Sequence, residues 1–182
     1  MGNSNDIKYG NTFYRQLFYK AFVTVTIVSE IAIWNVWFID KKSPFSWLST
    51  LVLALLETIL IVRLTCNQLS KVIGQSHLLS YVLILFGILI GLIVISFATD
   101  YVALYLMDSN NFETTLQLGD STLIIFFEFL YFSLITFLSV GFGDIVPIAF
   151  SSKLLVMLEV VLSFFVLVFG LANINRIHVN NK

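Results

Sequence analysis

The sequence predicts an all-α membrane protein with four transmembrane helices, one re-entrant helix and an extended glycine-containing strand. Hydrophobic residues make up 58% of the chain and charged residues only 12%, whereas soluble domains carry about twice that charged fraction. The apolar residues fall into long runs separated by polar segments. The net charge of −1 and the lack of a basic run exclude a nucleic-acid partner.

Four apolar runs approach the about 20 residues that a helix needs to cross a bilayer core. They cover residues 21–39, 47–62, 78–97 and 154–174. Residues 40–44 end the first run, because a proline disfavours helix at the residue before it. The polar residues 63–77 connect the second run to the third.

A fifth apolar segment is too short to cross the membrane. It follows the polar segment 100–120, and Ser121 or Thr122 is expected to cap its helix. A glycine-rich strand comes directly after it. Irregular backbone survives at membrane depth only where it lines a cavity or is buried in protein, so residues 122–138 are predicted to form a re-entrant helix.

The strand reads Ser139-Val140-Gly141-Phe142-Gly143-Asp144. Two glycines bracket one aromatic residue, and glycine reaches positive φ without steric cost. This pattern lets the backbone run extended with its carbonyl groups pointing one way. Around a four-fold axis, such strands would stack rings of carbonyl oxygens. That is a chemistry for dehydrated monovalent cations.

Residues 131–147 resemble the pore region of tetrameric potassium channels. The usual filter of that family reads Thr-Val-Gly-Tyr-Gly-Asp. Here Ser139 still offers a hydroxyl, and Phe142 contributes its carbonyl group and not its ring. The resemblance implies a filter of Ser139, Val140, Gly141, Phe142 and Gly143, with K⁺ held by the backbone oxygens of residues 139–142 and by the Ser139 hydroxyl.

The apolar runs predict the hairpin of the chain, and the resemblance, which covers about residues 78–174, implies its pore domain. Residues 1–77 would form an N-terminal segment and a two-helix transmembrane hairpin, and residues 78–182 the pore domain. The pore domain divides into an outer helix (78–106), a pore helix (122–138), the filter (139–144) and an inner helix (152–176). Because each chain has one filter strand, the pore needs a homotetramer. The expected ligands are K⁺ ions with no cofactor, and the expected partners are membrane lipids and an unseen regulatory protein.

Three residues are expected to support the outer mouth of the filter. Four copies of Asp144 would make an acidic ring that attracts cations. Tyr131 occupies a position where many family members carry a tryptophan, and its hydroxyl is predicted to bond the Asp144 carboxylate. Thr136 either faces the cavity entrance or packs against a neighbouring strand.

The last apolar run carries three candidate gating positions. Ser163 stands where the family often has a glycine hinge. Gly170 is either the alternative bending point or a site of close helix packing. Glu159 matches a carboxylate near the back of the pore helix, and its burial requires it to be hydrogen-bonded or neutral.

Glu30 and Glu57 lie near the midpoints of the first two runs. They are expected either to share a proton and sense pH, or to bond hydroxyl groups such as those of Thr26 or Thr58 without a functional role.

In the family the Gly-Asp end of the filter faces outside, which places both termini in the cytoplasm of a multi-pass plasma-membrane protein. The positive-inside rule agrees. Seven basic residues then lie inside and three lie outside; the inner ones are Lys8, Arg15, Lys20, Arg63, Lys71, Arg176 and Lys182.

The expected function is passive, selective potassium conduction. An enzyme is not expected, because the chain has no Ser/His/Asp or Cys/His set. Voltage sensing is disfavoured, since no helix carries an arginine at every third position. The alternative is a non-conducting or regulatory membrane subunit that assembles with another channel or transporter.

Overall fold

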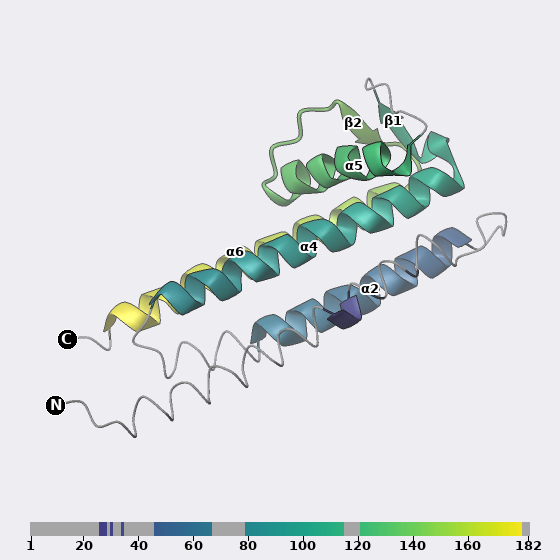
Figure 1. Cartoon of the computed structure of the whole chain (residues 1–182). Coiled ribbons are helices and arrows are strands. Elements are labelled where there is room, and N and C mark those ends of the chain that lie inside the picture. Colours follow the sequence, from purple (N-terminus) through teal and green to yellow (C-terminus); the bar gives the residue numbers. More distant parts are fainter. Residues whose placement is uncertain are drawn as a thin grey trace.

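The computed structural model describes residues 26–28, 30, 34, 46–66, 79–114 and 121–179. Within them the helices are α2 (Ser46–Leu64), α4 (Leu79–Met107), the 3₁₀ helix η2 (Ser109–Asn111), α5 (Thr122–Phe137) and α6 (Phe150–Val179). The strands are β1 (Phe112–Thr114) and β2 (Ile145–Pro147). The three long helices lie side by side, with α2 and α6 running opposite to α4, and α5 sits beside the outer end of α4 (Figure 1).

Three helices of the described part are long and apolar enough to cross a membrane. They are Ser46–Leu64, Phe86–Met107 and Phe150–Gly170, whereas Thr122–Phe137 is a shorter apolar helix. The first predicted span is described only at residues 26–28, 30 and 34, which are helical. The rest of that span lies outside the described residues, as does most of the 63–77 connector.

Two sequence-based expectations are corrected. Helix α4 ends at Met107, which agrees with the outer helix expected over 78–106, so the polar segment begins after α4 and not at Asp100, which α4 buries completely. The described part is also not purely helical, because β1 pairs with β2 as an antiparallel ladder in which Phe112 lies opposite Pro147 and Thr114 opposite Ile145. The ladder joins the segment after α4 to the segment after the filter strand.

The core lies where α4 packs against α5. Tyr101 is fully buried at its centre and makes ring contacts with Phe97, Phe112, Phe129 and Phe132, at centroid distances of 5.0 to 6.4 Å. Such tilted and edge-to-face pairs add to the free energy gained from burial alone. Helix α5 is therefore fixed to α4 by packed aromatic rings.

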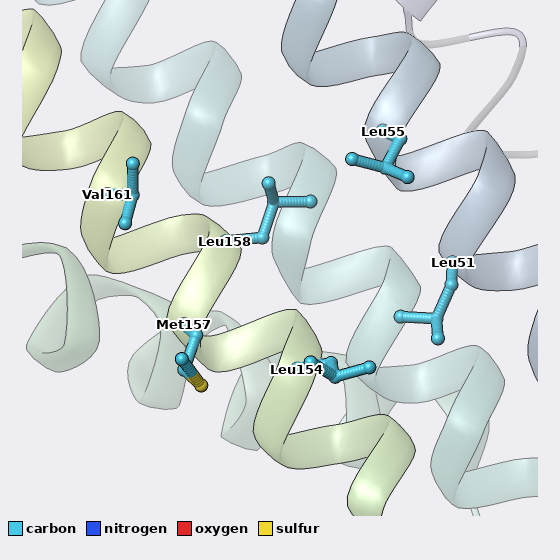
Figure 2. Close-up of a pocket in the computed structure, with 6 residues that line it drawn as sticks. All are labelled: Leu51, Leu55, Leu154, Met157, Leu158 and Val161. Carbon is cyan, nitrogen blue, oxygen red and sulfur yellow. The ribbon is translucent and has the colours of Figure 1, made fainter.

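Helix α2 buries a stripe of mostly small or polar residues. The stripe recurs every three or four positions and consists of Ser46, Thr50, Ala54, Glu57, Ile61 and Leu64. A cavity of about 290 Å³ lies between α2 and α6. Figure 2 shows its apolar lining, which comprises Leu51, Leu55, Leu154, Met157, Leu158 and Val161.

Candidate functional site

The glycine-containing strand has an alternating backbone. Ser139, Gly141 and Gly143 have positive φ values of 56°, 60° and 81°, whereas Val140 and Phe142 do not. Alternation of left- and right-handed residues places successive N–H groups on one side of a strand, and the carbonyl oxygens therefore face the other side. This is the geometry that a carbonyl-lined ion path requires.

Hydrogen bonds at the C-terminal end of α5 fix the inner end of this strand. The Val140 N–H donates to the Ile135 carbonyl at 2.8 Å, and the Ser139 N–H donates to the Thr136 carbonyl at 2.9 Å. These bonds use carbonyl groups that the end of a helix would otherwise leave unpaired. Thr136 itself is buried within the chain. Ser121 occupies the N-cap position at the other end of α5, but its side chain makes no capping bond.

The C-terminal end of the strand, at Asp144, is hydrogen-bonded to α5. The Tyr131 hydroxyl donates a hydrogen bond to the Asp144 carboxylate, which is the contact that the sequence predicts. Asp144 also accepts a bond from the Ile145 N–H at 3.1 Å. The carboxylate therefore joins the end of the strand to both α5 and the start of β2.

Strand β2 follows the alternating strand and pairs with β1, and we call β1, β2 and Asn111 together the outer clasp. The Asn111 side chain donates to the Leu104 carbonyl at 2.8 Å. Its backbone carbonyl accepts from the Ile148 N–H at 2.9 Å and from the Ser152 hydroxyl at 2.8 Å. Asn111 is buried, so it joins the end of α4 to the start of α6. Sequence reasoning missed it, because nothing distinguishes this asparagine from its polar neighbours.

Glu159 lies behind α5 and uses both carboxylate oxygens. The Tyr101 hydroxyl donates to Oε2 at 2.5 Å, and the Ser133 hydroxyl donates to Oε1 at 2.6 Å. All three side chains are completely buried. The structure thus supplies the hydrogen bonds that burial of Glu159 requires. Sequence reasoning missed both hydroxyl partners, because Tyr101 and Ser133 lie in helices that are apolar on all sides and carry no mark of this contact.

The two other candidate positions on α6, Ser163 and Gly170, each make a local contact. The Ser163 hydroxyl donates to the Glu159 carbonyl of its own helix at 2.7 Å. Gly170 is buried against Phe86 of α4, and a Cβ atom added there would lie 2.5 Å from the Phe86 ring. Of the two readings of Gly170, the structure therefore favours close helix packing.

Glu30 and Glu57 are not brought together by a hydrogen bond, although both lie in the described part. The Ser96 hydroxyl of α4 donates to Glu57, which is 1% exposed, whereas Glu30 is exposed. For Glu57 the structure therefore supports the second expectation, a bond to a hydroxyl group, and Ser96 supplies that hydroxyl. Thr58 does not, because it donates to the Ala54 carbonyl of its own helix.

Residues 101–180 match a family model described as "ion channel". The match begins at Tyr101 and contains the end of α4, all of α5, the alternating strand and α6. Helix α2 lies outside it. No curated protein and no solved structure matches the chain.

Proposed function

We propose that the chain conducts K⁺ passively and selectively across the plasma membrane; the match of residues 101–180 to an ion-channel family model supports this. The observation that carries this proposal is the alternation of φ at Ser139, Gly141 and Gly143, at the end of a short apolar helix. A strand of this kind offers a row of carbonyl oxygens that replaces the hydration shell of the ion.

In this proposal the filter runs from Ser139 to Gly143. The backbone oxygens of residues 139–142 and the Ser139 hydroxyl are the K⁺ ligands. The C-terminal end of α5 contributes a partial negative charge at the inner end of the filter. Asp144 adds negative charge at the outer mouth and raises the local cation concentration, an effect that salt screens.

The working pore is a homotetramer with the filter on its axis. The exposed apolar surface of a single chain supports this assembly. Val140 is 49% exposed and Phe142 is 69% exposed, and on α6 Val161 and Phe164 are 67% and 69% exposed. In this proposal, neighbouring chains cover the exposed apolar side chains next to the filter.

The orientation proposed is the one that places the Asp144 end of the filter outside the cell. Asp108 and Glu113 lie exposed near that end. With both termini in the cytoplasm, seven of ten basic residues are cytoplasmic, as the positive-inside rule favours.

Reconstitution in liposomes tests the proposal. Under a potassium gradient with sodium as the opposing cation, the reversal potential should follow the potassium gradient. Gly141→Ala protein, purified in the same way, controls for contaminating conductance. A reversal potential that ignores the potassium gradient would overturn potassium selectivity. Absence of any current from a tetrameric preparation would favour the alternative, a non-conducting subunit.

A further inference from the structure

We propose that Glu159 is a filter-positioning residue. From α6, its carboxylate binds Ser133 and so holds α5 in a fixed position against α6, while the Tyr101 hydroxyl fixes the carboxylate itself. This inference rests on the proposed function, because it concerns how the same filter keeps its geometry. It assigns Glu159 to support of the filter, in place of the gating role that its position on α6 suggested.

The first argument is the chemistry of the cluster, by which we mean Tyr101, Ser133 and Glu159. A carboxylate group has only acceptor sites when it is ionised, and both of its oxygens receive a hydroxyl donor here at 2.5 and 2.6 Å. A buried charge without such donors would be strongly unfavourable. The cluster is thus complete within one chain, and removal of any member leaves another polar group buried without its partner.

The second argument is the position of Ser133 on α5. The same short helix carries the Ile135 and Thr136 carbonyl groups that bind the first two filter amides, and it carries Tyr131, which binds Asp144. Among the described residues, the Ser133–Glu159 bond is the only hydrogen bond between side chains of α5 and α6. A rotation or slide of α5 against α6 would therefore break this bond and shift both ends of the filter.

The third argument is that Glu159 is itself held rigidly. The Tyr101 ring packs edge-on against Phe112 of β1 and Phe132 of α5, at 5.8 and 5.0 Å. Its hydroxyl therefore has little freedom to move away from Glu159. The Glu159 carboxylate is thus held by its own helix, α6, and by Tyr101 of α4. Its bond to Ser133 then fixes the position of α5 against these two helices.

The test compares Glu159→Ala, Ser133→Ala and Glu159→Gln, with Ser163→Ala as the matched control. Ser163 also donates to residue 159, but only to its backbone carbonyl, and makes no bond to α5. The readouts are the K⁺/Na⁺ permeability ratio in liposomes and the amide hydrogen exchange of Ser139 and Val140. Each variant is first shown to be tetrameric by cross-linking.

We expect Glu159→Ala to lower the permeability ratio about tenfold and to speed exchange of both amides by a similar factor, because two buried hydroxyl groups lose their acceptor. Ser133→Ala should lower the ratio about threefold, since one bond is lost. Glu159→Gln should stay near wild type, because the amide accepts from one hydroxyl and donates to the other. In a double variant, Ser133→Ala should add little to Glu159→Ala.

Unchanged selectivity and unchanged exchange in both Ser133→Ala and Glu159→Ala would overturn the inference while the proposed function stood. Equal losses in Ser163→Ala would also overturn it, since they would report general destabilisation of α6. If Glu159→Ala does not assemble, Ser133→Ala and Glu159→Gln decide the matter. If the wild-type protein itself fails to select K⁺, the proposed function fails, and amide exchange alone decides whether Glu159 positions the strand.

Discussion

Helix α5 has two sides: a front, which carries the strand 139–143, and a back, which packs on α4 and α6. The two sides differ in how many of their contacts come from the same chain. On the front, filter residues 139–143 are exposed, and the contacts are backbone bonds at one end and the Tyr131–Asp144 bond at the other. On the back, the side that faces α4 and α6, Ser133 and Phe129 are completely buried. They lie against aromatic rings and against the Glu159 carboxylate, which accepts two hydrogen bonds. A single chain therefore builds the support behind the strand but leaves residues 139–143 themselves exposed, where the proposed tetramer would place neighbouring chains.

The largest effect is expected on the front, from Gly143→Ala. Gly143 has φ 81°, with open space where a Cβ would lie, so the penalty is conformational, about 1–2 kcal/mol per chain and several times that in a tetramer. Potassium flux into liposomes should fall at least about a hundredfold by the same reasoning.

The control for this change is Gly87→Ala, which also meets no atom within 4 Å but lies in α4 without positive φ. It should leave the flux unchanged and stabilise the helix by about 1 kcal/mol. Equal flux from the Gly143→Ala and wild-type proteins would contradict a role for backbone handedness.

Asn111→Ala tests the outer clasp. The Leu104 carbonyl and the Ser151 hydroxyl lose their bonds to the side chain. We expect the free energy of unfolding, measured by denaturation in detergent, to fall by about 2 kcal/mol. Asn110→Ala removes an exposed side chain of the same type and should change stability by less than about 0.5 kcal/mol. Similar losses for both variants would mean that Asn111 has no special structural role.

Gly170→Ala tests the packing of α4 against α6. The new methyl group would overlap the Phe86 ring, and overpacking of this kind costs about 1–3 kcal/mol. The same denaturation assay should show this loss, and Phe86→Leu in the same chain should restore part of it. If Gly170 instead serves as a hinge, Phe86→Leu will not rescue the variant, and channel opening will change while stability does not.

The smallest effect is expected from Tyr131→Phe, which removes the hydroxyl bond to Asp144. A single hydrogen bond of this kind contributes about 0.5–1.5 kcal/mol, so the mean open time of single channels should shorten about threefold. Tyr105→Phe is the control, because the Tyr105 ring packs on Phe129 and its hydroxyl makes no hydrogen bond within the described part of the chain. Open times that do not distinguish the two variants would remove the proposed brace.

The short helix and the positive φ values of Gly141 and Gly143 could be predicted because they depend on local sequence. The contact between Tyr131 and Asp144 could be predicted from the resemblance to potassium channels. The packing behind α5 could not be predicted. Helices α4 and α6 are apolar on all sides, so their sequences do not show which face meets which neighbour. Ser133 and Ser96 therefore gave no sign that they would meet Glu159 and Glu57.

The small sheet escaped prediction for a different reason. Each of its strands has three residues, too few for an alternating pattern to be recognised. The charge of Asp100 predicts an exposed position at the start of the polar segment, and its complete burial within α4 reflects tertiary packing that overrides this preference.

The alternating backbone of residues 139–143 has a consequence for the chain before it assembles. A regular β-ladder needs N–H and carbonyl groups that alternate between the two edges of each strand, and a strand with alternating handedness does not offer such an edge. Within the described residues, the ladder with β1 accordingly begins at Ile145. An unassembled chain thus exposes its filter without presenting the open strand edge on which other chains could add and aggregate.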